Sequence, residues 1–416
     1  MIDMTTLLTP TRRQALIGLS LAPLVLSACG QPTGAEIAAN APWDDVLSKA
    51  RGQDVNWAAW AGDAKINAYI GWVSSEVRLR FGIALTHVKT NDTANTMHQL
   101  LVDKLSGRTD GGRTDLIWIN GENFTAALDA GLLWGPFAQH LPHWSMVDTK
   151  GNPSILTDFT VPNNGYESPW GMAQLTFFYD SANGVSPPRT IAAFSEWAAS
   201  HPGRFTYPAP PDFAGITFVK QALYAFITDR SILSKPVVKA DFPRTTAALW
   251  AYFDALHPNL WRGGRAFPPD YPTLRQMLED RETDIAFSFN PAEASTAVTS
   301  GLLPATTRAY ILDGGTIQNT HFVAIPFNAA AKAAALVVAN FLLSPEAQAR
   351  KADPRLWGDP TVLDLHALAP VDRARFTDLP NTAQLPDAAA LAHALAEPHP
   401  SWHVHLVEAW RARYAT

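Results

Sequence analysis

Residues 116–124, LIWINGENF, give the clearest indication of the fold class of this chain. The four apolar residues Leu116 to Ile119 have the length and composition of a strand buried on both faces of a sheet. Polar residues follow them, and we expect a helix from Asn123 to Ala130 that is closed by Gly131. This stretch therefore predicts a strand, a short loop and a helix, which is the repeating unit of an α/β protein.

Two further units of the same kind precede it. Residues 55–60 and residues 83–88 predict strands. A helix is expected after each, because apolar residues recur there at spacings of three and four. The apolar positions are Ile66, Tyr69, Ile70, Val73 and Val77 in the first helix, and Met97, Leu100, Leu101 and Leu105 in the second. Three such units in a row predict a parallel sheet with helices on both faces.

A second set of elements follows. Strands are expected at residues 175–179, 205–207, 284–289 and 321–325, with helices between them. After removal of an export signal, about 390 residues remain, which suits two lobes better than one domain. The predicted fold class is therefore α/β with two lobes, each a mostly parallel sheet flanked by helices.

The N-terminus predicts export. Arg12 and Arg13 precede an apolar stretch, residues 15–28, that is too short to span a bilayer. It ends in residues 26–30, LSACG, which resemble a bacterial lipobox and imply cleavage before Cys29 and its acylation. Residues 11–16 also resemble a twin-arginine signal. We expect a signal peptide at 1–28 and a flexible tether at 29–52; the alternative is an ordinary signal peptide cut slightly later.

Composition limits the partners. The net charge is −6, and −7 without Arg12, Arg13 and Asp3, which leaves 30 basic and 37 acidic residues and no basic cluster for nucleic acid. Cys29 is the only cysteine, which excludes thiol chemistry in the mature protein. The sequence motifs of nucleotide-binding loops, serine hydrolases and zinc proteases are missing. We therefore expect no cofactor, no metal and no catalysis.

Several segments resemble the YnjB-type solute-binding lipoproteins of ABC importers. They are residues 60–63 (WAGD), 91–93 (NDT), 116–124, 131–137 (GLLWGPF) and 202–213 (PGRFTYPAPPDF). The order of elements is similar to that of type II periplasmic binding proteins, whose chain crosses between two lobes. The resemblance implies crossings at residues 168–174 and 319–322. It implies one lobe of residues 53–172 plus 318–352, and another of 173–317 plus 353–416.

The resemblance also implies a function. A monomer would capture a small molecule between the lobes and deliver it to a membrane permease that is driven by a separate ATPase. Because the chain has no nucleotide-binding loop, it cannot supply the energy itself. An exported hydrolase and a ligand-sensing subunit on the same fold stay open as alternatives.

Ligands of α/β proteins bind beyond the carboxyl ends of the strands, which selects a set of loops. In those loops Asp63, Asp92 and Glu122 would form an acidic wall that favours a cation, and Trp60, Trp170 and Tyr207 could stack on it. The other candidate ligand-binding residues are Gly62, Thr93, Asn120, Gln174, Asp212, Asn290 and His321.

Each of these residues also has a structural interpretation. Aspartate is a preferred helix cap, glutamate in a first turn complements the helix dipole, and most tryptophans are packed in cores. His399, His403 and His405 could be metal ligands, but we expect them to lie on a solvated tail, because no third ligand is evident on another element.

Overall fold

The computed structural model describes residues 37–415. The predicted signal peptide, the lipidation site Cys29 and the first part of the predicted tether lie outside the described residues. Within the described part of the chain, no helix is both long enough and apolar enough to cross a membrane.

The sheet of the first lobe is mixed. Its central strands are β1 (Asp54–Trp60), β2 (Ala84–Thr90) and β3 (Leu116–Ile119), in which β1 pairs in parallel with both others. The long strand β11 (Thr316–Pro326) lies antiparallel to β3. Strands β4 (Leu133–Trp134) and β7 (Glu167–Gln174) also pair with β11, and β12 (Ala394–Ala396) adds a parallel edge. The parallel order predicted for the first three strands is confirmed.

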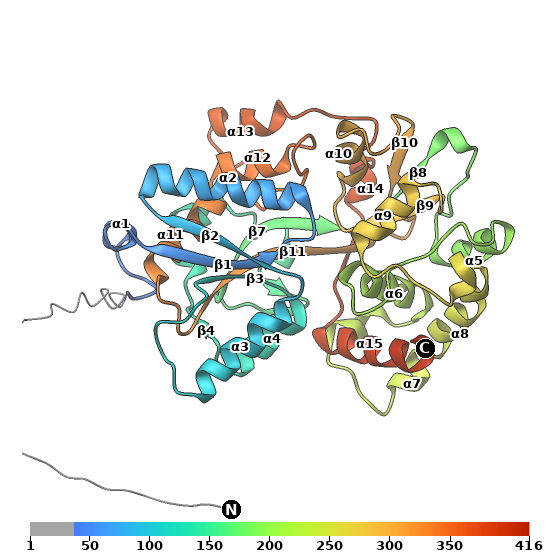
Figure 1. The fold of residues 1–416 in the computed structure, drawn as a ribbon, viewed down its shortest axis with the longest axis horizontal. Helices are drawn as coiled ribbons and strands as arrows, with labels where there is room; N and C mark the ends of the chain where they lie inside the picture. Colours follow the sequence, from blue (N-terminus) through green and yellow to red (C-terminus); the bar gives the residue numbers. More distant parts are fainter. Residues whose placement is uncertain (1–36, 416) are drawn as a thin grey trace, which may run out of the picture. The chain divides into compact units, whose positions relative to one another are not determined.

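Helices cover both faces of this sheet (Figure 1). Helix α2 (Ala64–Phe81) lies on one face, and α3 (Thr93–Leu105) and α4 (Gly121–Asp129) lie on the other. The first lobe also contains α11 (Lys332–Leu342), α12 (Pro345–Ala352) and α13 (Pro370–Thr377). The buried faces of α2 and β1 meet in an apolar core with Trp57, Ile70 and Val73, all completely shielded from solvent.

The second lobe has a small sheet in the order β10-β8-β9. Its strands are β8 (Thr176–Asp180), β9 (Ile285–Ser288) and β10 (Thr307–Tyr310), and both pairings are antiparallel. Around it lie α5 (Ile191–Ser200), α6 (Phe213–Phe226), α7 (Phe242–Thr245), α8 (Ala247–Leu256), α9 (Tyr271–Glu279), α10 (Glu293–Thr299), α14 (Ala388–Leu391) and α15 (Pro400–Tyr414).

The expectation of a mostly parallel second sheet is wrong, and so is the strand predicted at residues 205–207. Phe205 and Tyr207 lie in a buried, irregular segment, whose backbone carbonyl at Phe205 accepts from the N–H of Trp261. A short apolar run indicates burial, but it does not separate a strand from a buried connection. Strand direction depends on partners far away in the chain, since β8 pairs with β9 more than a hundred residues later.

The flexible tether predicted at 29–52 is wrong for residues 37–52, because the chain is packed there. Ile37 is buried, and α1 (Trp43–Ala50) follows, with Val46 and Ala50 directed into the first core beside α11. These two residues lie four positions apart, so they share one face of the helix.

The return to the second lobe also occurs later than residue 353. Trp357, Val362, Leu363 and Leu368 belong to the core of the first lobe, and α13 packs against α12. The chain reaches the second core with Trp402, Leu406 and Trp410 of α15. Strands β7 and β11 connect the two lobes at the point where Gln174 pairs with Gln318.

Candidate ligand-binding site

Two of the three predicted acidic residues cap helices. A side-chain oxygen of Asp63 accepts a hydrogen bond of 2.6 Å from the N–H of Lys65 at the start of α2. Asp92 accepts a bond of 2.9 Å from the N–H of Ala94 at the start of α3 and is exposed. Satisfying the free N–H groups of a helix start accounts for both aspartates locally.

The predicted stacking of a ligand on Trp170 and Tyr207 is wrong, because both side chains are buried in cores. Trp170 is fully buried in the first core, where its ring packs against Trp57 and Trp118 at centroid distances of 5.3 and 4.9 Å. Tyr207 is fully buried in the second core, and its hydroxyl lies 2.7 Å from Nε2 of His257 and accepts a bond from Trp410. Neither ring can stack on a solute, because other core side chains cover both.

Four other candidates lie in the first-lobe loops or at the crossing between the lobes. The Trp60 ring lies over Gly62, where an added Cβ would come within 2.3 Å of it, so this position has room only for glycine. Thr93 donates to the carbonyl of Trp118 over 3.2 Å. Gln174 is buried at the crossing, and its Nε2 has no hydrogen-bond partner.

A charged contact joins the lobes at the starts of α2 and α10. The Lys65 ammonium donates to Oε2 of Glu293 over 2.7 Å and to the hydroxyl of Thr296 over 2.8 Å. Arg275 of α9 lies 3.7 Å from the other carboxylate oxygen of Glu293. Glu293 is almost fully buried, so removal of Lys65 would leave a buried carboxylate with a weaker partner.

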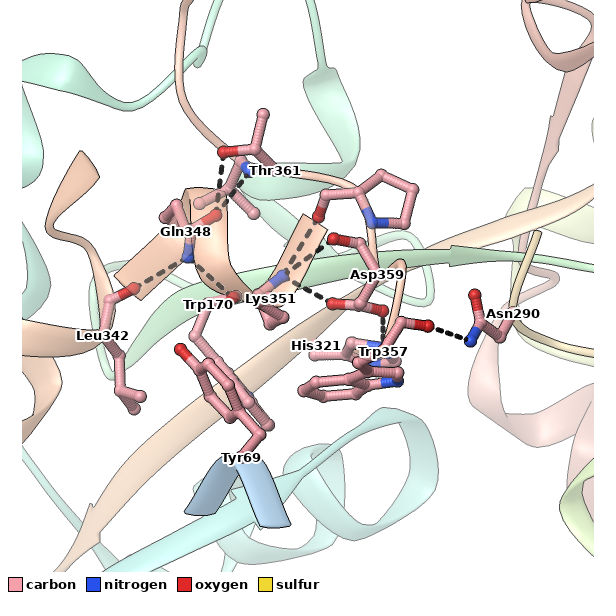
Figure 2. A network of polar contacts seen from close by, with 12 residues as sticks. Tyr69, Trp170, Asn290, His321, Leu342, Gln348, Lys351, Trp357, Asp359 and Thr361 are labelled. Atoms are coloured by element: carbon pink, nitrogen blue, oxygen red, sulfur yellow. Dashed lines mark hydrogen bonds and ion pairs between the residues drawn. The ribbon is translucent and has the colours of Figure 1, made fainter. Parts of the chain in front are cut away.

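A second contact between the lobes passes through the loop after α12, as Figure 2 shows. Nδ2 of Asn290, in the second lobe, donates to the carbonyl of Trp357 over 2.8 Å. The same loop carries Asp359, which is ion-paired with the buried Lys351 and lies 3.0 Å from Nε2 of His321. His321 on β11 and Asn290 of the second lobe therefore contact the same loop only two positions apart, at Asp359 and Trp357.

A third group of polar residues gathers where α4, α6 and α15 meet. Lys220 is fully buried; its ammonium donates to Oε2 of Glu397 over 2.5 Å and lies 4.7 Å from the centre of the Phe159 ring. Oε2 of Glu122 lies 3.4 Å from Nδ1 of His403. We call Glu122, Asp158, Lys220, Glu397 and His403 the interlobe cluster.

The first lobe supplies Asp158 to this cluster, in β5 (Thr157–Asp158), which pairs with β6 (Val161–Pro162). Oδ2 of Asp158 accepts from the N–H of Gly121 over 2.7 Å at the start of α4. The side chain of Asn120 donates to the carbonyl of Thr320 over 2.7 Å and so ties the same loop to β11.

Burial controls ionisation in the cluster. Partial burial raises the pKa of Glu122 to about 7, against the opposing effect of Lys220. Burial raises the pKa of Asp158 well above its usual range despite the bond from Gly121. Burial, and then the Lys220 charge, lower the pKa of His403 to about 3. His403 is therefore neutral at pH 7, and its contact with Glu122 is not an ion pair.

Asp212 caps α6 by accepting from the N–H of Gly215 over 3.1 Å, and burial raises its pKa to about 6.

The C-terminal histidines do not lie on a solvated tail. His399 caps α15, and His403 is buried within that helix. Among the described residues, no three metal-ligating side chains gather closely enough to hold an ion.

Sequence reasoning missed Asp158, Lys220 and Glu397. Asp158 and Glu397 lie outside long elements, and no periodic pattern marks them. Lys220 did carry a signal, because it is the one charged residue in the mostly apolar helical run of residues 213–226. A buried charge on a packed helix requires a partner, although the sequence does not say where the partner lies.

Two α/β lobes joined by crossing strands, with polar side chains facing each other between them, are an architecture typical of ligand-binding proteins. A family model described as bacterial extracellular solute-binding protein matches residues 81–390, and the chain belongs to this family. It is 43% identical over 374 residues to Protein YnjB of Escherichia coli K12, which covers 90% of this chain and 94% of that protein.

Solved structures support the same fold. A putative spermidine/putrescine ABC transporter protein from Listeria monocytogenes superimposes with a TM-score of 0.60 at 14% identity, covering 86% of this chain and 98% of that one. The periplasmic binding protein AfuA from Actinobacillus pleuropneumoniae, with fructose-6-phosphate bound, gives 0.59 at 13% identity, covering 87% and 99%. The predicted type II periplasmic binding protein fold is confirmed, as is the resemblance to YnjB.

Proposed function

We propose that this protein is the solute-capturing component of an ABC importer. A small molecule binds between the lobes, the lobes close by bending at β7 and β11, and the closed form docks on a permease that a separate ATPase drives. The family and its structural relatives support this role. The observation that carries it is the set of polar contacts between the lobes: Lys65 with Glu293, Asn290 with the Trp357 carbonyl, and Glu122 beside His403.

A thermal-shift screen of residues 30–416 tests this function. The panel contains polyamines, thiamine, sugars, oxyanions and metal ions. A ligand at 100 times its dissociation constant stabilises the protein by about 2.7 kcal/mol, so one class of compound should raise the unfolding midpoint while the others do not. Absence of any shift, or chemical turnover of a bound compound, would contradict the proposal.

We also propose that the exported protein is a monomer anchored through lipid at Cys29, and that a twin-arginine signal directs its export. The expected result of Cys29→Ser is release of the protein from the membrane fraction with its ligand affinity unchanged. Replacement of Arg12 and Arg13 by lysine should block export if the twin-arginine route is used. A Cys29→Ser protein that stays with the membranes would disprove the anchor.

A further inference from the structure

The interlobe cluster contains more carboxylates than cations. Glu122, Asp158 and Glu397 lie near one another, and Lys220 is the ammonium among them. His403 adds no positive charge at pH 7, because burial keeps it neutral. Burial raises the pKa of Glu122 and Asp158, so these carboxyl groups are partly protonated in the free protein, and a ligand that brings positive charge would stabilise their ionised forms.

Polar groups without partners are directed into the same place. Oδ1 of Asp158 is buried and has no hydrogen-bond partner. Nδ1 of His403, in a residue only 9% exposed, is also without a partner and lies 3.4 Å from Glu122. The side chain of Asn319, which is 5% exposed, contacts Glu397, and its Oδ1 has no partner. Buried polar atoms are rarely left unpaired, so this set needs a partner that supplies donors.

Lys220 shows which chemistry the cluster accommodates. Its ammonium is paired with Glu397 and lies 4.7 Å and 5.4 Å from the ring centres of Phe159 and Phe213. A carboxylate combined with aromatic faces stabilises an alkylated nitrogen cation by charge and by cation–π attraction. It suits an organic cation better than a bare metal ion, because aromatic rings provide no ligand atoms.

We propose that the captured solute is a small organic cation whose positively charged nitrogen binds in the interlobe cluster, beside Glu122, Asp158 and Glu397. This inference rests on the proposed function and assigns the ligand class to it. The carboxylates that contact the cation are then Asp158 and Glu397 in place of Asp63 and Asp92, which cap helices. Glu122 belongs both to the predicted acidic wall and to this site. Because α4 and β5 come from one lobe, and α6 and α15 from the other, such a ligand would hold the lobes together.

Binding should then be linked to proton release. Glu122 faces Lys220, Glu397 and Asp92, and His403 lies beside it; Asp158 in turn faces Glu122, Glu397 and Glu167. Partial burial gives Glu122 a pKa of about 7, so near pH 7 part of the population carries a proton there. An arriving cation favours the charged carboxylate and expels that proton. Affinity should therefore rise with pH between about 6 and 8, by at most about tenfold per pH unit for each proton released.

Isothermal titration of the mature protein tests the inference. The probes are putrescine, spermidine, choline and thiamine as cations, 1,4-butanediol and glucose as neutral compounds, and fructose 6-phosphate and citrate as anions. We expect one cationic probe to bind, with proton release at pH 7 seen as a dependence of the heat on the ionisation enthalpy of the buffer. The variants Glu122→Gln and Asp158→Asn should each weaken that probe about tenfold or more. Each of these two variants should also reduce the proton release, because each removes one carboxyl group that is protonated in the free protein.

The matched control is Glu346→Gln, which neutralises a carboxylate of the first lobe that is paired with Arg80. It should leave affinity and proton release unchanged, and circular dichroism should show that all three variants fold. Binding of only a neutral or anionic probe would overturn the cation inference and leave solute capture intact. Binding of no probe from any class would overturn both. Equal affinity of wild type, Glu122→Gln and Asp158→Asn for a cationic probe would also overturn the assignment of the site.

Discussion

At the scale of single residues, charged side chains in fully buried positions define the functional regions of this protein. Lys351 and Lys220 are both completely shielded from solvent, and each has a carboxylate partner, Asp359 and Glu397. A buried ion pair adds little to the net stability of a protein, but loss of one partner leaves the other charge buried and unpaired. Lys220 and Glu397 belong to the interlobe cluster, and Lys351 with Asp359 fixes the loop whose Trp357 carbonyl accepts from Asn290 of the other lobe.

Replacement of Lys351 by methionine should destabilise the protein strongly. Asp359 would keep only His321 as its side-chain partner, and the bond from Lys351 to the Pro360 carbonyl would be lost. We expect the free energy of unfolding to fall by about 3–5 kcal/mol in urea denaturation. The double variant Lys351→Met with Asp359→Asn should recover part of this loss. A single variant as stable as the exposed control Lys150→Met would contradict the expectation.

Asp158 and Glu167 make a second prediction at this scale, about pH. Burial, and then the charge of Asp158, raise the pKa of Glu167 well above its usual range, and neither of its carboxylate oxygens has a partner. In the unfolded chain the pKa is about 4.3. Between these two values the folded state holds the extra proton, so stability falls as pH rises.

Glutamine cannot ionise, so Glu167→Gln should reduce this loss. Relative to wild type, the variant should gain at least about 1 kcal/mol in free energy of unfolding between pH 5 and pH 8, measured by urea denaturation at each pH. The exposed Asp45→Asn serves as the control and should show the pH dependence of the wild type. A constant difference between Glu167→Gln and wild type across this range would refute the raised pKa.

At the scale of elements, α1 is an integral part of the first lobe. Ile37, Val46 and Ala50 are buried against it, and the helix packs on α11. We expect a chain that begins at residue 53 to be less stable than one that begins at residue 37, by at least about 2 kcal/mol, because full burial of one valine or isoleucine contributes about that much. Urea denaturation of the two chains measures the difference. Equal stability would restore the tether interpretation of residues 37–52.

At the scale of the whole molecule, a few polar contacts join the lobes, and the proposed hinge closure would depend on them. Lys65 provides one of them through Glu293 and Thr296, while Arg275 keeps a longer contact with Glu293 from within the second lobe. Removal of Lys65 therefore weakens the closed arrangement without disturbing either core. Hinge closure balances such contacts against solvation of the separated loops, so a single contact can shift the equilibrium.

The variant Lys65→Met should shift the population towards open forms by about tenfold, which corresponds to about 1.4 kcal/mol. Small-angle scattering should report a larger radius of gyration, and affinity for the captured solute should fall. Arg80→Met is the matched control, because Arg80 pairs with Glu76 and Glu346 inside the first lobe. An unchanged radius for Lys65→Met would show that other contacts set the closure.

What the sequence determined by itself is local or repetitive. The first three β–α units follow from apolar spacing, and the helix caps Asp63 and Asp92 follow from residue type. The likeness to solute-binding proteins follows from long segments such as residues 116–124. All of these depend on neighbours within a few residues, where periodicity and capping are readable.

The tertiary structure alone decided which polar residues meet. Lys220 and Glu397 lie 177 positions apart, and the pairing of β12 with β11 brings Glu397 beside α6. It also decided that Trp170 and Tyr207 are core residues, since an aromatic side chain near a loop reads the same in sequence whether it faces solvent or the interior. The physical reason is that burial and electrostatic pairing depend on distance in space, which sequence separation does not reveal.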